Sequence, residues 1–399
     1  MADLVFAFDP VLDRPLPAPE AAAAAVAETI SGATAAAFET AVAAAVEGRA
    51  AAVVILGRIL DPLRASPAQA ATVRRHVVTL ADAGCRTIVV ADGASACHDL
   101  SRMLGEPRGL GFVTPLAGCE LDVRGIAVEI VSAHGPLAAA EPQAGSGGLR
   151  RRIVVGCETS AGPDPFAPAD NAAPAWAQPG SFWVWGSRRR RSLPPGVHHL
   201  PALQARGPAE GGPGACATLA LLDRSEPARS DAGPAGPLSD WRGSWRELPT
   251  HHVAWSTLAV ESPAGGDEEL AAAIWSALES RPATTAGPLE VVRVAVACGT
   301  SVARRVRVAE IAAETLARLR DYLGPRPTRL WVRELVADPH ESLVPLGHAR
   351  SGGRPGTTTS FSSALADIVA DLEHSPAPAL APFEAREAGW LALELVESG

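Results

Sequence analysis

The sequence predicts an α/β fold that contains a doubly wound sheet. Three short runs rich in Val, Ile and Leu each end at a Gly or an Asp, over residues 4–8, 51–56 and 86–90. Between them lie two segments with apolar residues at helical spacing, over residues 34–48 and 67–83. Strands that alternate with helices form a parallel sheet, and its ligand site lies at the carboxyl ends of the strands. We therefore expect the turns after these three strands to converge on one crevice.

Individual residues justify these elements in chain order. The first strand stops at Asp9-Pro10, because proline cannot continue a hydrogen-bonded ladder. The two helices end at Gly48 and Gly84, where glycine serves as the C-cap. The second strand breaks at Gly57, and a charged residue follows it. This pattern is typical of a buried parallel strand whose carboxyl end opens onto a site.

The remainder of the chain is richer in predicted strands, and it divides at a low-complexity stretch over residues 225–238. Strands are expected over residues 125–131, 152–156, 181–186, 215–222, 253–260, 289–297 and 329–335. Helices are expected over residues 267–278, 309–323, 362–372 and 382–395. We infer domains over residues 1–245, 246–340 and 341–399.

The composition is that of a soluble globular protein. The formal net charge of −9 argues against a general polyanion binder, so any contact with nucleic acid is expected to be local. The six cysteines show no C-x-x-C pair and no Cys/His ligand spacing, which indicates neither a zinc module nor a disulfide framework. The alanine run at residues 21–25 is too short to span a bilayer, so we expect a cytoplasmic protein without a membrane contact.

Five short motifs follow the predicted strands. They are Asp9-Pro10-Val11, Gly57-Arg58-Ile59-Leu60-Asp61, Asp92-Gly93-Ala94-Ser95, Gly156-Cys157-Glu158-Thr159 and Gly186-Ser187-Arg188-Arg189. In order and spacing they resemble the D-x-H, G-D-x-x-D, G-N-H-D/E, lone-His and G-H-x-H motifs of the calcineurin-like metallophosphoesterases. Within that superfamily, residues 4–336 resemble the bacterial SbcD-like DNA-repair exonucleases.

The resemblance implies a four-layer α-β-β-α metallophosphoesterase-like sandwich followed by a small α+β capping domain. In the family, a pair of Mn, Fe or Zn ions roughly 4 Å apart hydrolyses phosphodiesters. The positions that correspond to the metal site are Asp9, Val11, Arg58, Gly93, Ala94, Glu158, Ser187 and Arg189. Of these, only Asp9 keeps a ligand of the family type, and Glu158 is a replacement that could coordinate a metal.

Arg58 stands where the resemblance places a metal-bridging Asp. A guanidinium about 4 Å from a divalent ion costs on the order of 8 kcal/mol at an effective dielectric of about 20. We therefore expect no bound metal and no catalytic residues, with an ion pair between Asp9 and Arg58 at the former metal position. The chain is then a pseudoenzyme with a scaffold or regulatory role in a nuclease–ATPase DNA-repair complex.

The resemblance also implies partners, namely an SbcC-like coiled-coil ATPase and a second copy of the chain. DNA is a candidate ligand through local arginine patches. The candidate anion-binding residues are Arg58, Arg188 and Arg189, although a solvated loop is the simpler interpretation of such a patch.

The alternative function is an active metal-dependent phosphoesterase or nuclease with an atypical ligand set. That set comprises Asp9, Asp92 and Glu158.

Other residues near the motifs have simpler structural explanations. The pair His198-His199 fits an edge or surface position, because adjacent side chains on a strand point apart. Trp183 and Trp185 share one face of a strand and fit packing better than base stacking. Cys157 has no His base beside it in the sequence, so a nucleophilic role is not expected.

Overall fold

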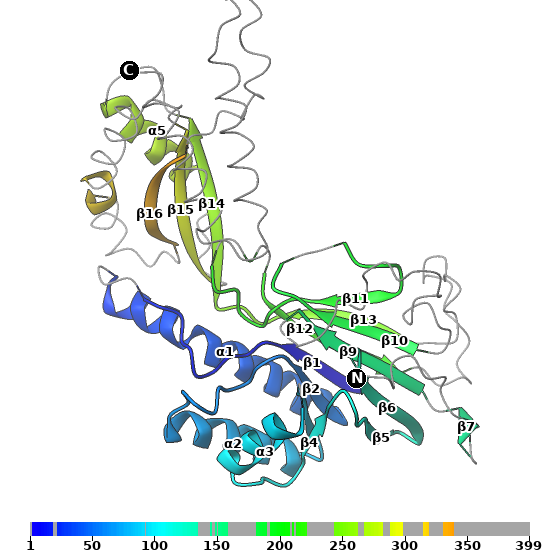
Figure 1. The fold of residues 1–399 in the computed structure, drawn as a ribbon. Helices are drawn as coiled ribbons and strands as arrows, with labels where there is room; N and C mark the ends of the chain where they lie inside the picture. The colour runs from blue at the N-terminus through cyan, green and yellow to red at the C-terminus, as the bar shows by residue number, and fades with distance from the viewer. Residues whose placement is uncertain are drawn as a thin grey trace, which may run out of the picture. The chain divides into compact units, whose positions relative to one another are not determined.

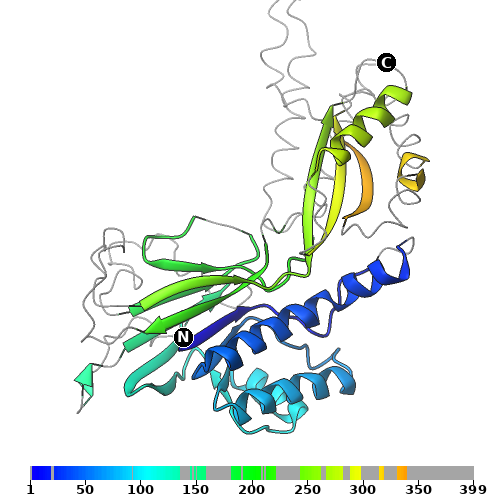
Figure 2. The same ribbon diagram turned by 180° about the vertical axis from the view of Figure 1, so that it is seen from behind.

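The computed structural model contains two compact units. The first comprises Met1–Trp255 and Gly287–Glu290, and the second comprises Ser256–Ala286 and Val291–Gly399. Figure 1 and Figure 2 show the fold from opposite sides. The structure describes residues 2–18, 22–91, 93–134, 144–145, 148–149, 151–158, 181–189, 192–207, 210, 213–221, 243–261, 267–281, 288–297, 314–318 and 330–338.

A six-stranded mixed sheet lies at the centre of the first unit, with the strand order β13-β12-β1-β2-β3-β4 (Figure 1). Its strands are β1 (Leu4–Phe8), β2 (Ala52–Leu56), β3 (Arg86–Val90), β4 (Leu110–Val113), β12 (Ala215–Leu221) and β13 (Gly243–Pro249). The first four run parallel, β12 lies antiparallel beside β1, and β13 lies antiparallel beside β12. Every residue of β1 and β2 is buried, which explains why both are apolar throughout.

Three helices cover one face of this sheet (Figure 2). They are α1 (Ala24–Gly48), α2 (Pro67–Asp82) and α3 (Ala94–Leu104). The start of α2 is fixed by a capping box between Ser66 and Gln69, with a proline in the first turn. By length and composition alone α1 could cross a membrane. Its buried side chains, including Phe38 and Val42, nevertheless belong to the core against the sheet.

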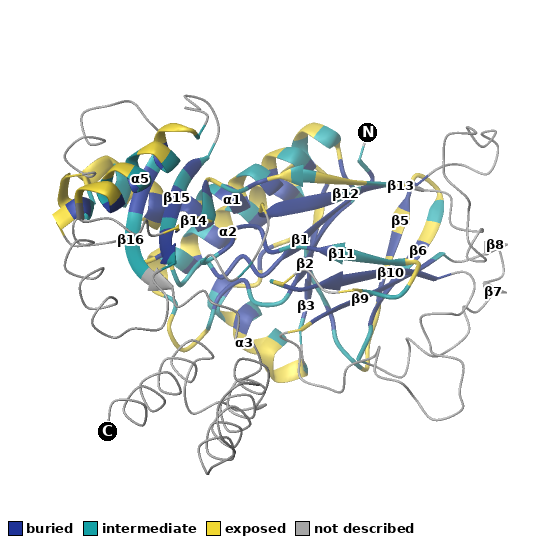
Figure 3. Cartoon of the chain, turned by 90° about the horizontal axis from the view of Figure 1, so that it is seen from above, coloured by how far each residue is buried: buried dark blue, intermediate teal, exposed yellow. Residues whose placement is uncertain are grey.

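A second, five-stranded sheet packs face to face against the other side of the first, with the order β11-β10-β9-β6-β5. Its strands are β5 (Cys119–Val123), β6 (Ile126–Ser132), β9 (Arg151–Cys157), β10 (Ser181–Gly186) and β11 (Val197–Leu200). Only the β5–β6 pair is antiparallel. Phe6 and Phe8 from the first sheet share a core with Ile153 and Val184 from the second. Figure 3 shows buried residues along the strands of both sheets. A separate two-stranded ladder is formed by β7 (Ala144–Gly145) and β8 (Gly148–Leu149).

The second unit is built on a three-stranded sheet with the order β14-β15-β16. Its elements are β14 (Val253–Glu261), α5 (Asp267–Glu279), β15 (Leu289–Ala297) and β16 (Leu330–Asp338). Ile274 of α5 packs against Val260, Val294 and Val332 of the three strands. The small α+β unit therefore has its own hydrophobic core.

Most predicted elements of the first unit are confirmed, and the α/β class with them. The first helix is longer than predicted and begins at Ala24, because its alanine-rich first turns have high helix propensity but few large apolar side chains to mark a face. The predicted domain boundary at Trp245 falls inside β13, which pairs along its length with β12. The helix α3 and the strands β4, β5, β11 and β13 were not predicted.

Four predicted segments lie wholly or mostly outside the described residues, namely the linker, the two C-terminal helices and one further helix. These segments are residues 225–238, 362–372, 382–395 and 309–323.

Candidate functional site

Asp9 follows directly after β1, at the carboxyl edge of the six-stranded sheet. Its backbone φ of 51° lies in the left-handed region, which few residues other than glycine adopt. The Asp9 amide donates to the Leu56 carbonyl at 2.8 Å, which ties this turn to the end of β2. The side chain is only 1% exposed. Local folding therefore places a buried carboxylate in a strained turn, where α/β proteins carry their sites.

Strand β10 of the second sheet brings Arg188 to this carboxylate. Gly186 ends β10 against β1, and a Cβ atom at this position would lie 2.5 Å from Phe8 Cδ2. Two residues later, Arg188 Nε donates to Asp9 Oδ2 at 2.7 Å, and Nη2 contacts the same oxygen. The glycine thus permits the close approach of two sheets that brings these opposite charges together.

Two further carboxylates contact Arg188. Its Nη1 lies 3.4 Å from Glu210 Oε1, and its backbone amide donates to Glu158 Oε1 at 2.6 Å. Burial on its own lowers the pKa of Arg188, but the charge of Asp9 and the hydrogen bond to it, with the charges of Glu210 and Glu158, raise the pKa above its ordinary value. We call these four residues the Arg188 cluster.

The segment after β11 supports the Arg188 cluster from one side. The Arg206 amide donates to Glu210 Oε2 at 2.8 Å, and Arg206 Nη2 donates to the Arg14 carbonyl at 2.7 Å. Burial, followed by the charge of Arg188, lowers the pKa of Arg206. Gln204 is buried and bonds the backbone at the start of β14 through both ends of its amide. The Arg206 amide thus holds the Glu210 carboxylate, and Gln204 anchors the segment that precedes Arg206.

The predicted ion pair between Asp9 and Arg58 is wrong. Arg58 Nη1 instead lies 3.5 Å from Asp61 Oδ2, three residues further along the same turn. The physical reason is proximity, since the turn that begins at Gly57 places its own carboxylate beside Arg58, while β10 supplies a cation to Asp9. The charge beside Asp9 therefore comes from the second sheet and not from the neighbouring strand.

Three of the positions that the resemblance assigns to a metal site carry no ligand group, namely Val11, Gly93 and Ala94. Val11 is buried in a left-handed conformation, and its amide donates to the Arg58 carbonyl at 3.0 Å. Gly93 is the N-cap residue of α3, and Ala94 is its first residue. These three positions are thus occupied by turn and helix-start residues.

Ser187 and Arg189 lie in different environments. They stand at the two positions where the resembling motif G-H-x-H has histidines. Ser187 is fully buried, and its Oγ donates to the Arg189 carbonyl at 2.5 Å. The same oxygen lies 3.1 Å from His199 Nε2. Because the hydroxyl proton is directed to a carbonyl and the side chain is inaccessible, this Ser–His contact is structural. The Arg189 residue is exposed.

Of the predicted site residues, the structure joins Asp9, Glu158 and Arg188. Glu210 and Arg206 were not predicted as site residues, and His199 was expected only at an edge or surface position. Arg206 lies in the segment Leu203-Gln204-Ala205-Arg206, which resembles the family's N-L-Q-G-R and could have drawn attention to it. Glu210 gave no signal, because it stands in a Gly/Pro-rich loop without secondary-structure periodicity.

The described donors do not fit the two-ion site of the resembling family. Across the described ranges, no group of three or more His, Cys, Asp or Glu side chains is arranged to hold a metal ion. Asp9 Oδ2 and Glu158 Oε1 both accept from Arg188. Asp92, part of the alternative ligand set, lies outside the described residues.

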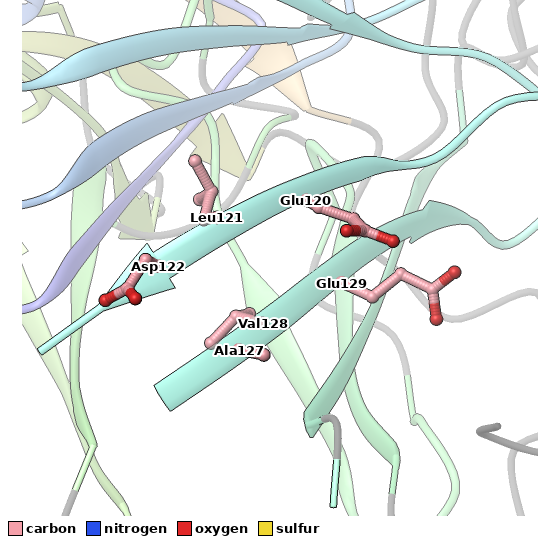
Figure 4. Close-up of a pocket in the computed structure, with 6 residues that line it drawn as sticks. All are labelled: Glu120, Leu121, Asp122, Ala127, Val128 and Glu129. Atoms are coloured by element: carbon pink, nitrogen blue, oxygen red, sulfur yellow. The ribbon is translucent and has the colours of Figure 1, made fainter. Parts of the chain in front are cut away.

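An open depression on the second sheet is a separate feature (Figure 4). It is lined by Glu120, Leu121, Asp122, Ala127, Val128 and Glu129 on the hairpin of β5 and β6. Glu120 and Glu129 stand opposite each other in the ladder, and Arg152 Nε donates to Glu129 at 2.9 Å. The depression is thus lined by the residues of one hairpin, and Arg152 neutralises Glu129 beside it.

Comparison of the sequence with protein-family models finds no matching family. Comparison with curated proteins finds no significant match. The function therefore has to be inferred from the motifs and from the geometry of the Arg188 cluster.

Proposed function

We propose that this chain is a catalytically inactive relative of the SbcD-like exonucleases, with a scaffold or regulatory role in a DNA-repair complex. The observation that carries the proposal is the ion pair of Arg188 with the buried Asp9, at the position of the first metal ligand in the resembling family. A guanidinium supplies one fixed positive charge and hydrogen-bond donors. It cannot polarise a water into a hydroxide nucleophile, which is the task of the two metal ions.

The proposal extends to the fold. A helix layer, two facing sheets and a small α+β unit are consistent with the four-layer sandwich and capping domain of that family. The outer face of the second sheet, which points away from the first sheet, carries apolar side chains. Trp183, Val131 and Val154 form a small apolar cluster on that face, which suits coverage by further elements.

The chain keeps the scaffold that the resemblance implies, while most of the family's metal ligands are replaced. This combination favours a binding role over a catalytic one. The proposed partner is an SbcC-like coiled-coil ATPase in the cytoplasm, with a second copy of the chain as a further partner and DNA as a ligand of local arginine patches. A pull-down with purified chain and such an ATPase from the same genome is expected to recover a complex. Failure to associate with every ATPase of this type would contradict the proposed partner.

The loss of catalysis has a direct test. Protein purified and dialysed against Mn²⁺ is expected to contain far less than one metal ion per chain by mass spectrometry. It is also expected not to hydrolyse bis-p-nitrophenyl phosphate. Stoichiometric metal that disappears in Asp9→Ala, together with turnover, would instead establish the active phosphoesterase with the atypical set Asp9, Asp92 and Glu158.

A matched pair of variants tests whether Arg188 replaces a metal cation. Arg188→Ala leaves Asp9, Glu158 and Glu210 without their shared positive charge, so we expect it to bind more Mn²⁺ than the wild type. Arg189→Ala removes an exposed neighbouring cation and is expected to leave Mn²⁺ binding unchanged. Equal metal binding by wild type and both variants would show that Arg188 does not compete with a metal.

A further inference from the structure

Three arginines gather around one carboxylate at the turn after β2. Arg14 Nη2, Arg58 Nη1 and Arg64 Nε lie 3.5, 3.5 and 3.7 Å from the same oxygen, Asp61 Oδ2. Because all three contacts converge on a single atom, the three guanidiniums surround a common point. We call Arg14, Arg58 and Arg64 the arginine trio.

Among the described residues, few groups contact the N–H donors of the arginine trio. Hydrogen bonds of N–H to oxygen span about 2.7–3.2 Å, so the contacts with Asp61 are ion pairs without hydrogen bonds. Within the described part of the chain, the only polar partners of these guanidiniums are Asp61 and Asp13, the latter 3.7 Å from Arg14 Nε. Arg14 Nε is buried without a hydrogen-bond partner there. Each guanidinium carries five N–H donors, so the trio can bind an additional acceptor.

Charge and exposure orient the arginine trio towards solvent. The Asp13 and Asp61 side chains are 0% and 18% exposed, whereas those of Arg14, Arg58 and Arg64 are 39%, 40% and 67% exposed. Three cations therefore lie over two carboxylates, which leaves a local excess of positive charge on a chain with net charge −9. An anion that approaches from solvent meets the guanidiniums first.

Backbone hydrogen bonds hold the two turns that carry the arginine trio. The Leu12 amide donates to the Ile59 carbonyl at 2.9 Å. The Asp61 amide donates to Asp13 Oδ1 at 3.2 Å, and the Leu63 amide donates to Asp61 Oδ1 at 3.1 Å. The backbone positions that carry the cations are thus set before a ligand arrives, which lowers the entropic cost of binding.

We propose that the arginine trio is a phosphate-binding site. Planar guanidinium forks match the tetrahedral oxygens of phosphate, and several such forks around one point suit a single phosphate group better than a flat carboxylate. The phosphate comes either from free inorganic phosphate or from the backbone of a polynucleotide. The second source locates the DNA contact of the proposed function and rests on it, while binding of inorganic phosphate is independent of it.

The test uses inorganic phosphate in calorimetry and a fluorescent single-stranded oligothymidylate in anisotropy. Arg58→Gln/Arg64→Gln is expected to weaken binding by about tenfold or more, because it removes two charge-assisted contacts. The slope of log K against log salt for the oligothymidylate is expected to fall in magnitude by about 0.7 for each lost contact. Arg75→Gln removes an exposed charge on α2 outside the trio and serves as the matched control.

A second variant is expected to change the phosphate affinity in the opposite direction. It therefore keeps the test valid if the double variant is poorly folded. Asp61→Asn keeps the oxygen that accepts from Leu63 but removes the competing negative charge, so it is expected to tighten phosphate binding. Binding of phosphate alone supports a small-anion site, and binding of both probes supports a polynucleotide backbone. The proposal is overturned if wild type binds neither probe, if Arg75→Gln weakens binding as much as the double variant, or if Asp61→Asn does not tighten binding.

Discussion

At the level of single residues, the central feature is a buried carboxylate with an arginine as its counterion. Asp9 is nearly inaccessible, while the Arg188 side chain is 30% exposed. Within the described structure, Asp9 Oδ1 has no hydrogen-bond partner, so the whole interaction falls on Oδ2. Loss of the cation therefore leaves a desolvated negative charge, which is more costly than loss of both members of the pair.

Arg188→Gln is expected to lower the free energy of unfolding by about 2 kcal/mol, less than for a fully buried pair because the arginine is partly exposed. The double variant Asp9→Asn/Arg188→Gln is expected to be more stable than Arg188→Gln alone. Urea denaturation of the four proteins in this cycle measures the coupling. Additive effects of the two substitutions would show that the pair contributes no coupling energy.

At the level of elements, the site depends on how closely β10 approaches β1. The two strands belong to different sheets, and Gly186 faces the Phe8 ring at their meeting point. A side chain there would have to displace an aromatic ring within the shared core. Gly186 is therefore required for packing, independently of any catalytic role of its motif.

Gly186→Ala is expected to destabilise the first unit by about 1–3 kcal/mol, the usual cost of overpacking. Gly207→Ala is the control, because a Cβ at that position would meet nothing within 4 Å. Thermal or urea unfolding of both variants measures the difference. A Gly186→Ala protein as stable as Gly207→Ala would mean that the two sheets can move apart without cost.

At the level of the whole first unit, an aromatic cluster joins the edges of the two sheets. His198 of β11 stacks on Phe182 of β10 with ring centroids 4.3 Å apart, and Trp245 of β13 lies 5.1 Å from His198. Burial lowers the pKa of His198 to about 4. The predicted edge position of His198 is confirmed, and its half-buried ring packs against Phe182 and Trp245.

The lowered pKa makes the stability of this unit depend on pH. His198 is neutral in the folded chain, while the unfolded chain takes up a proton below its ordinary pKa of about 6.5. The contribution of His198 to the free energy of unfolding is therefore fully present above pH 6.5. As the pH falls towards about 4, this contribution decreases by about 3 kcal/mol in total. Urea midpoints between pH 7 and pH 4 measure this loss, which His198→Phe is expected to reduce. An unchanged pH profile in His198→Phe would assign the loss to other groups.

The sequence by itself determined the parallel strands β1, β2 and β3, the helix α2 and the small α+β unit, because periodicity and capping are local signals. The prediction that the metal ligands of the resembling family are missing rests on residue identity and on the resemblance, and it stays a prediction. Only the tertiary structure decided which cation neutralises Asp9, because Arg188 stands 179 positions away along the chain. The same applies to the arginine trio, whose members come from two turns that only the pairing of β1 with β2 brings together.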